Sequence, residues 1–312
     1  MLKHNLNDSN FATLFGTSCG AINTSVKNLI DSLDFRYRII VGEELEALLL
    51  DVLKRIDLDT QIVGAEDRRE VWDRGWRENL EDFRTNQPSE ASLVPKFIRN
   101  GNPLRLFRSY VASEDPAFEL NFVKVLRAWM FNEYFREISD IYEFGCGTGF
   151  NLVALSDLYP EKTLFGSDFV SSSVDLVNEI ASRKNISLSG FLFDMKNPDS
   201  SYLLRPNSGV FTFGALEQLA GSVDQFFNYL LSQSPKICIH IEPDESLYNS
   251  SNLYDYLALR FQNKRGYTGG LSKKLIVLEE QKKISVIKSI RVPFGSLMME
   301  GYNIFVWQPW GN

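Results

Sequence analysis

The sequence of 312 residues predicts an α/β protein in which a doubly wound sheet follows a mainly helical N-terminal region. Residues 141–151, Ile-Tyr-Glu-Phe-Gly-Cys-Gly-Thr-Gly-Phe-Asn, are an apolar strand that runs into a turn with glycine at every second position. Two more apolar strands, 163–168 and 190–194, end in aspartate, and helical sequences begin at Asn151 and Ser171. This alternation is typical of a parallel sheet whose ligand site lies at the carboxyl ends of its strands.

The glycine-rich turn has the composition of a ligand-binding loop. Gly145, Gly147 and Gly149 lack a Cβ atom, so the backbone can take positive φ and approach a flat ligand closely. Dinucleotide folds use Gly-x-Gly-x-x-Gly to bind a pyrophosphate, whereas this loop is Gly-x-Gly-x-Gly preceded by the acidic Glu143. A carboxylate at that point favours a cationic ligand over a diphosphate.

These residues resemble motif I of the class I S-adenosylmethionine-dependent methyltransferases, whose consensus is an acidic residue followed by Gly-x-Gly-x-Gly. The resemblance covers residues 136–312, which we expect to form the cofactor-binding domain after an N-terminal region of residues 1–135. It implies a Rossmann-like sheet of seven strands whose last two form an antiparallel hairpin. It also implies an enzyme of the methyltransferase class with S-adenosylmethionine as its cofactor.

The resemblance assigns cofactor contacts in chain order. Asp168 would hold the ribose hydroxyl groups and Phe169 would line the adenine, while Asp194 and Met195 would supply a carboxylate for the adenine amine and an apolar wall. After the fourth strand the family often has Leu-Glu-His, where this chain has glutamine as the third residue. The predicted cofactor-binding residues are Glu143, Gly145, Cys146, Gly147, Gly149, Asn151, Asp168, Phe169, Asp194, Met195 and Leu216.

The remaining elements complete the expected sheet. Residues 208–213 and 236–243 are predicted as the fourth and fifth strands, residues 247–261 as a helix, and residues 283–293 and 301–309 as the final hairpin.

Methyl transfer from a sulfonium is an in-line displacement, which requires alignment and exclusion of water but no metal. If the acceptor is a hydroxyl group, a base must also remove its proton. The candidates are Glu217 after the fourth strand and His240 and Glu242 on the fifth. His240 fits equally a buried strand residue, because Ile239 and Ile241 flank it in an alternating pattern.

Basic and aromatic residues suggest contacts to the acceptor. The segment between Pro95 and Tyr110 interleaves cations with aromatic residues, which fits either a solvated surface or a site for an anionic group. Arg265 and Tyr267 fit either acceptor binding or a surface turn with a core tyrosine. The predicted substrate-binding residues are Arg99, Arg108, Tyr110, Arg265 and Tyr267.

The first 135 residues show helical periodicity in two stretches, 45–56 and 122–130. Between them lies a segment of mixed charge that carries Trp72 and Trp76. We expect this region to cover the carboxyl edge of the sheet, as extensions of this kind do in methyltransferases. The tryptophans fit either that role or packing between helices.

Composition limits the partners. A net charge of −7 argues against a nucleic-acid partner, and no apolar run is long enough to cross a membrane. The N-terminus lacks the apolar centre of a signal peptide, and Cys19, Cys146 and Cys238 have neither metal-like nor disulfide-like spacing, so we expect a cytoplasmic protein without a metal. The sequence predicts no particular oligomeric state.

Three functions remain open at the level of sequence. The first is methylation of an oxygen or nitrogen of a small molecule, such as a sugar, a glycan precursor or a secondary metabolite. The second is a non-catalytic module that binds the cofactor or assembles with a partner. The third is methylation of a protein.

Overall fold

The computed structural model describes residues 2–65, 68–85, 90–221 and 223–311. Its main feature is a seven-stranded sheet with the order β10-β12-β9-β8-β5-β6-β7. The five strands from β5 to β9 are parallel, and β12 pairs antiparallel with both β9 and β10. The predicted fold class is therefore confirmed. The strands are β5 (Asp140–Phe144), β6 (Thr163–Asp168), β7 (Leu188–Leu192), β8 (Gly209–Phe213), β9 (Ile237–Glu242), β10 (Ile284–Ile290) and β12 (Asn303–Pro309).

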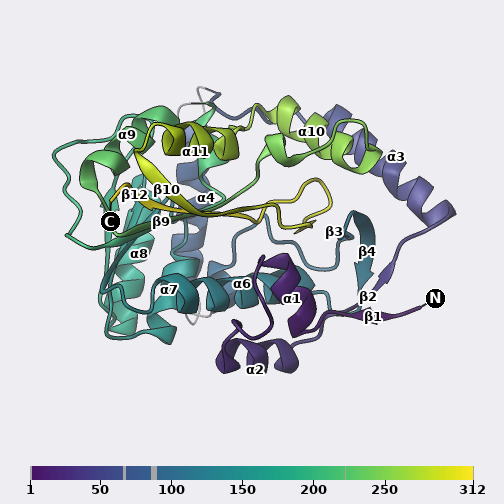
Figure 1. Ribbon diagram of the computed structural model, residues 1–312, viewed down its shortest axis with the longest axis horizontal. Helices are drawn as coiled ribbons and strands as arrows, with labels where there is room; N and C mark the ends of the chain where they lie inside the picture. The colour runs from purple at the N-terminus through teal and green to yellow at the C-terminus, as the bar shows by residue number, and fades with distance from the viewer. Residues whose placement is uncertain (1, 66–67, 86–89, 222, 312) are drawn as a thin grey trace.

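Helices cover both faces of this sheet (Figure 1). One face carries α9 (Val223–Gln233) and α11 (Leu271–Glu280), and the opposite face carries α6 (Phe118–Tyr134), α7 (Phe150–Leu158) and α8 (Ser171–Lys184). The helices predicted after the first two strands are present as α7 and α8. None of the helices in the described ranges combines the length and the apolar character that crossing a bilayer requires.

The helix predicted from residue 247 begins later than expected. A short 3-10 turn, η2 (Glu245–Leu247), comes first, and α10 (Leu253–Arg265) starts after Asn252. The physical reason is capping, because the Asp244 side chain accepts from the amide of Ser246 and the Asn252 side chain accepts from the amide of Asp255. A second 3-10 turn, η1 (Leu216–Leu219), follows β8.

The N-terminal region contains a second sheet that the sequence did not predict. Its strand order is β1-β2-β4-β3-β11, and β11 comes from the segment that joins β10 to β12. The strands are short, which hides their period-two pattern. The elements are β1 (His4–Asn5), α1 (Asp8–Leu14), α2 (Thr24–Ser32), β2 (Arg36–Ile39), α3 (Glu43–Leu58), α4 (Arg68–Thr85), α5 (Glu90–Leu93), β3 (Leu104–Leu106), β4 (Ser109–Ser113) and β11 (Phe294–Gly295).

One apolar core joins the two regions. The largest cluster of buried residues includes Phe11 and Phe15 from α1 and its end, Phe122 from α6, and Ile141 from β5. The ring of Phe122 stacks on that of Phe294 with centroids 3.8 Å apart. The predicted boundary at residue 135 thus falls within a shared core, and the division into residues 1–135 and 136–312 stays a prediction.

Candidate active site

The glycine-rich loop leaves the centre of the large sheet in the conformation that its sequence predicts. Gly145, Gly147 and Gly149 have φ values of +75°, +53° and +73°. A Cβ atom at Gly145 would lie 2.5 Å from the Cβ of Ala215. The loop after β8 therefore packs directly against the backbone of Gly145, which only glycine permits. Gly149 is the left-handed N-cap of α7, and its role is to start that helix.

Glu143 is the buried carboxylate at the end of β5. Its Oε1 accepts a hydrogen bond of 2.7 Å from Asn151 Nδ2, whereas its Oε2 has no hydrogen-bond partner within the described residues. Burial raises the pKa of Glu143 to about 8, although the hydrogen bond from Asn151 opposes that shift. A positively charged group beside Oε2 would relieve both the missing hydrogen bond and the cost of burying the charge.

Asp168 ends β6 and lies beneath the glycine loop. Its Oδ2 accepts from the amide of Gly147 at 3.1 Å and its Oδ1 from the amide of Val170 at 3.3 Å. Burial raises the pKa of Asp168 to about 6, with these amides acting in the opposite direction. Asp194, after β7, accepts from the amide of Lys196 at 2.9 Å. A carboxylate has about four acceptor positions, so both aspartates keep acceptor positions for a ligand.

These groups line one cavity of about 650 Å³, which we call the main cavity. It extends along the carboxyl edge of the large sheet, from Asp194 after β7 to Tyr302 just before β12. The structure therefore brings together residues that the sequence placed on separate elements. The predicted residues on its wall are Glu143, Gly145, Cys146, Gly147, Asn151, Asp168, Phe169, Asp194, Met195, Glu217, Arg99, Arg265 and Tyr267.

The strand order decides the fold family. The glycine loop follows β5, which lies between β8 and β6 in the parallel part of the sheet, and β12 is inserted antiparallel between β9 and β10. The chain has the class I S-adenosylmethionine-dependent methyltransferase fold. In this methyltransferase fold the chain continues from β5 to β6 and β7 on one side and to β8 and β9 on the other. The main cavity lies at this switch point, which is the usual ligand site of doubly wound sheets.

No protein-family model and no curated protein match the chain. Among solved structures it is similar to magnesium protoporphyrin IX methyltransferase from Synechocystis PCC 6803 with bound SAH, at 12% identity and a TM-score of 0.49 over 77% of this chain and 97% of that one. It is also similar to the O-methyltransferase of a polyketide synthase from Brevibacillus brevis, at 12% identity and a TM-score of 0.44 over 62% and 74%.

The same search finds the [4+2]-cyclase SpnF, at 12% identity and a TM-score of 0.45 over 60% of this chain and 81% of that one. At these identities the likeness concerns the fold alone. The reaction of this chain must therefore be argued from its own residues.

Helix α4 covers the glycine loop. The rings of Trp72 and Trp76 stack with centroids 5.3 Å apart, and a Cβ at Gly147 would lie 3.0 Å from the Trp76 ring. Arg68 lies over Trp72 and donates to Gln218 Oε1 at 2.9 Å. Both tryptophans line the main cavity, as expected for a covering extension.

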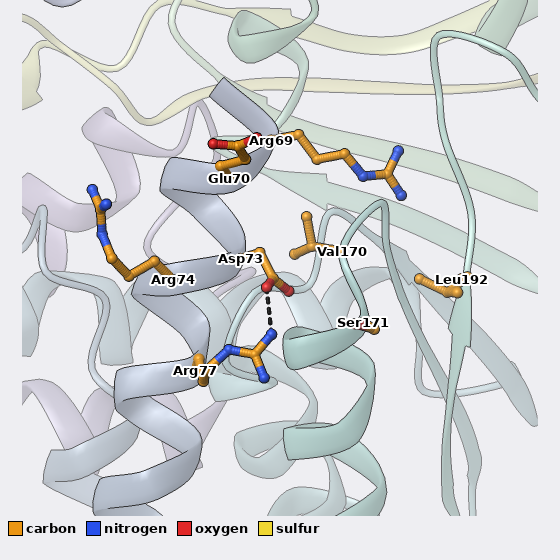
Figure 2. A pocket seen from close by; sticks show the side chains of 8 residues that line it. All are labelled: Arg69, Glu70, Asp73, Arg74, Arg77, Val170, Ser171 and Leu192. Atoms are coloured by element: carbon orange, nitrogen blue, oxygen red, sulfur yellow. Dashed lines mark hydrogen bonds and ion pairs between the residues drawn. The ribbon is translucent and has the colours of Figure 1, made fainter. Parts of the chain in front are cut away.

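The outer side of α4 borders a second cavity of about 500 Å³ (Figure 2). Asp73 and Arg77 point toward one another there, in an ion pair of 2.5 Å. Asp73 also accepts from the amide of Ser172 at 3.3 Å, at the start of α8. This polar cluster fixes α4 on α8 and so holds the tryptophans over the glycine loop.

Two of the three predicted bases do not fit that role. The wall of the main cavity does not include His240 or Glu242 among the residues that the structure describes. His240 is fully buried between Thr212 Oγ1 at 2.9 Å and the indole N–H of Trp307 at 3.0 Å, and burial lowers its pKa to about 3. His240 is therefore a buried strand residue, which was the alternative to a catalytic base in the sequence analysis.

Glu242 binds backbone instead of facing the cavity. Its two oxygens accept from the amides of Ala215 and Leu216, both at 3.1 Å. Burial, together with the neighbouring Glu217, raises the pKa of Glu242 well above its usual range. Glu242 therefore shapes the loop after β8, and Glu217 is the predicted base that lines the cavity. Leu216 and Gly149 also lie off the cavity wall, where they shape their loops.

Some of the predicted substrate-binding residues line the main cavity and others do not. Arg108 and Tyr110 lie away from the described wall of the main cavity. Phe107 and Arg108, with φ of +48° and +61°, form the two-residue turn between β3 and β4, so Arg108 projects from a hairpin tip. Tyr110 is buried and accepts from Arg105 at 3.0 Å. Arg265 and Tyr267 are joined by a 3.0 Å hydrogen bond at the wall, and Arg99 lies at its rim.

The sequence analysis missed Glu119, a buried carboxyl in the first turn of α6 that lines the main cavity. It precedes Phe122 by three residues and Leu126 by seven, so it falls on the apolar face of a helix that the sequence did predict. A carboxyl group on an otherwise apolar helix face is the sequence feature from which Glu119 could have been predicted. Its partner Tyr302 gave no comparable signal.

Proposed function

We propose that this chain transfers a methyl group from S-adenosylmethionine to an oxygen or nitrogen atom of a small molecule. The observation that carries the proposal is the unpaired Oε2 of Glu143, buried beside the glycine loop on the wall of the main cavity. An amino-acid ammonium group would supply the missing donor and would place a positive charge directly beside Oε2. The residues present therefore fit this cofactor better than they fit a diphosphate.

Each end of the cofactor has matching residues. Asp168 has acceptor positions for the ribose hydroxyl groups, Phe169 offers an aromatic face, and Asp194 with Met195 offers an acceptor and an apolar surface for adenine. When bound, S-adenosylmethionine supplies an activated methyl group. The protein's own part is to orient the acceptor and exclude water.

A small-molecule acceptor suits the shape of the site. Small-molecule pockets have volumes of about 300–1,000 Å³, and the main cavity, at about 650 Å³, lies under α4 with Trp72 and Trp76 on its wall. A net charge of −7 disfavours nucleic acid as acceptor. Sugars, glycan precursors and secondary metabolites are therefore the first acceptors to test.

Isothermal calorimetry with S-adenosylmethionine, S-adenosylhomocysteine and NAD tests the proposal. We expect micromolar binding of both sulfur compounds and none of NAD. Binding of NAD alone would overturn the cofactor assignment. Binding of the sulfur compounds, with no labelled methyl transferred to any small molecule in a broad screen, would support the non-catalytic module instead.

Asp168→Ala is expected to weaken S-adenosylhomocysteine binding by about 1–3 kcal/mol, because hydrogen bonds to a charged acceptor are lost. Calorimetry measures the change. Asp199→Ala is the matched control, since Asp199 is an exposed carboxylate that bonds only locally to Ser201 in the described structure and lies off the cavity wall. Equal affinity of the Asp168 variant and the wild type would remove Asp168 from the site.

A further inference from the structure

The end of the main cavity furthest from β7 has a distinct composition. We call it the acceptor end and define it by Glu119, Phe213, Pro243 and Tyr302. Phe213 ends β8 and Pro243 follows β9, on the far side of the glycine loop from the strands β6 and β7. If the cofactor occupies β5 to β7, the acceptor end is where a methyl acceptor must enter.

Glu119 is the acidic group of the acceptor end. It is 4% exposed, and its Oε1 accepts a hydrogen bond of 2.9 Å from the hydroxyl of Tyr302. The backbone amide of Arg99 is its other donor. No salt bridge neutralises Glu119 in the described part of the chain, which is unusual for a buried carboxylate.

The surroundings of Glu119 are aromatic. The Tyr302 ring lies 5.8 Å from Phe122, 5.9 Å from Phe213 and 5.8 Å from Phe294 between centroids. Desolvation by these neighbours raises the pKa of Glu119 to about 7, although the Tyr302 hydroxyl and the Arg99 amide oppose the shift. A carboxyl that exchanges its proton near neutral pH is well matched to proton transfer.

We propose that Glu119 is the catalytic base of the methyl transfer and that Tyr302 is its positioning residue. The inference rests on the function proposed above. As the acceptor oxygen or nitrogen forms its bond to the methyl carbon, the carbon–sulfur bond breaks and its electron pair stays on sulfur. The acceptor proton passes to the Glu119 carboxylate, so the negative charge of Glu119 and the positive charge of the sulfonium disappear together. Glu119 then returns the proton to solvent.

Glu119 suits this role better than Glu217. The amide side chain of Gln218 donates to Glu217 Oε1 at 3.3 Å, and Glu217 lies in the loop next to the glycine loop. Glu119 lies beside Tyr302 at the acceptor end, whereas the loop that carries Glu217 packs against the glycine loop. In-line displacement requires the nucleophile to approach from the side opposite the leaving sulfur.

The first test needs no acceptor. Carbon-13 NMR of protein labelled at the glutamate carboxyl carbons should contain a resonance that is absent from Glu119→Gln and that titrates near pH 7. In Tyr302→Phe this midpoint should move to higher pH, because the hydroxyl that stabilises the carboxylate is gone. A midpoint near the ordinary glutamate value of about 4.3 would overturn the proposal.

The second test measures transfer of labelled methyl groups to a panel of sugars, phenols and amines. Glu119→Gln should lower the rate about 100-fold to 10,000-fold and remove its rise between pH 6 and pH 8. Tyr302→Phe should shift that rise to higher pH, which a purely structural role would not do. Loss of the pH-dependent rate in Glu217→Gln, with Glu119→Gln unchanged, would assign the base to Glu217 instead.

Calorimetry separates the two proposals. Glu119→Gln should bind S-adenosylhomocysteine as the wild type does, because Glu119 lies away from β5 to β7. Absence of binding in the wild type would contradict the proposed function itself. Normal binding together with wild-type transfer by Glu119→Gln would overturn the catalytic base alone.

Discussion

Gly147→Val is expected to weaken S-adenosylmethionine binding by about 100-fold or more, equivalent to about 3 kcal/mol. Gly147 has φ of +53°, which a β-branched residue rarely adopts, and its Cβ would lie 3.0 Å from the Trp76 ring. The side chain would fill the space between the loop and α4, and it would disturb the amide that binds Asp168. Isothermal calorimetry measures the loss.

Gly101→Val is the matched control. Gly101 has φ of +74°, but no atom of the described residues lies within 4 Å of its added Cβ, and the described wall of the main cavity does not include it. The two variants carry the same kind of backbone strain, whereas Gly147→Val alone fills the site. Similar affinities in the two variants would mean that the glycine loop does not contact the ligand.

Glu143→Gln is expected to change both stability and affinity. The pKa of Glu143 is about 8 in the folded protein and about 4.3 in an unfolded chain. The folded state therefore holds a proton that the unfolded chain releases as pH rises above 4, so wild-type stability falls between pH 4 and pH 8 and then levels off. The variant lacks this carboxyl group. Between pH 4 and pH 8 its free energy of unfolding should therefore decrease less than that of the wild type, and the difference should be on the order of a few kcal/mol.

Chemical denaturation at several pH values measures this difference. Glu161→Gln removes an exposed carboxyl as the control, and it should leave the pH dependence as in the wild type. Calorimetry at pH 7 should show S-adenosylmethionine binding weaker by about 1.5–3 kcal/mol in Glu143→Gln, since a bond to a charged group is lost. A pH profile identical to that of the wild type would contradict the burial argument for Glu143.

The cofactor side of the site could be predicted because its signals are local. Gly145, Gly147 and Gly149 follow Glu143 within one strand and turn, and Asp168 ends the next strand. The glycines indicate where the backbone takes positive φ, and the acidic residues mark where strands end. Parallel pairing then brings those strand ends to one edge of the sheet. The sheet of seven strands with its final antiparallel hairpin was implied by the methyltransferase resemblance, and the succession of strands and helices in the sequence agrees with it.

The acceptor side could not be predicted in this way. His240 and Glu242 satisfy the strand-end rule, but their partners, Trp307 and the amide of Ala215, come from other strands and loops. Only pairing in three dimensions shows that these side chains are already occupied. The short strands β3 and β4 escaped detection because three to five residues are too few to establish a period.

The pairing of Glu119 with Tyr302 spans 183 residues of sequence. Contacts between residues this far apart in sequence form slowly, because closing the long intervening loop costs conformational entropy before the contact can stabilise the fold. The ribosome releases Glu119 and the whole glycine loop well before Tyr302. A nascent chain therefore carries the complete cofactor loop while the acceptor end still lacks Tyr302, so Glu119 gains this hydrogen-bond donor only after the rest of the cavity wall has been synthesised.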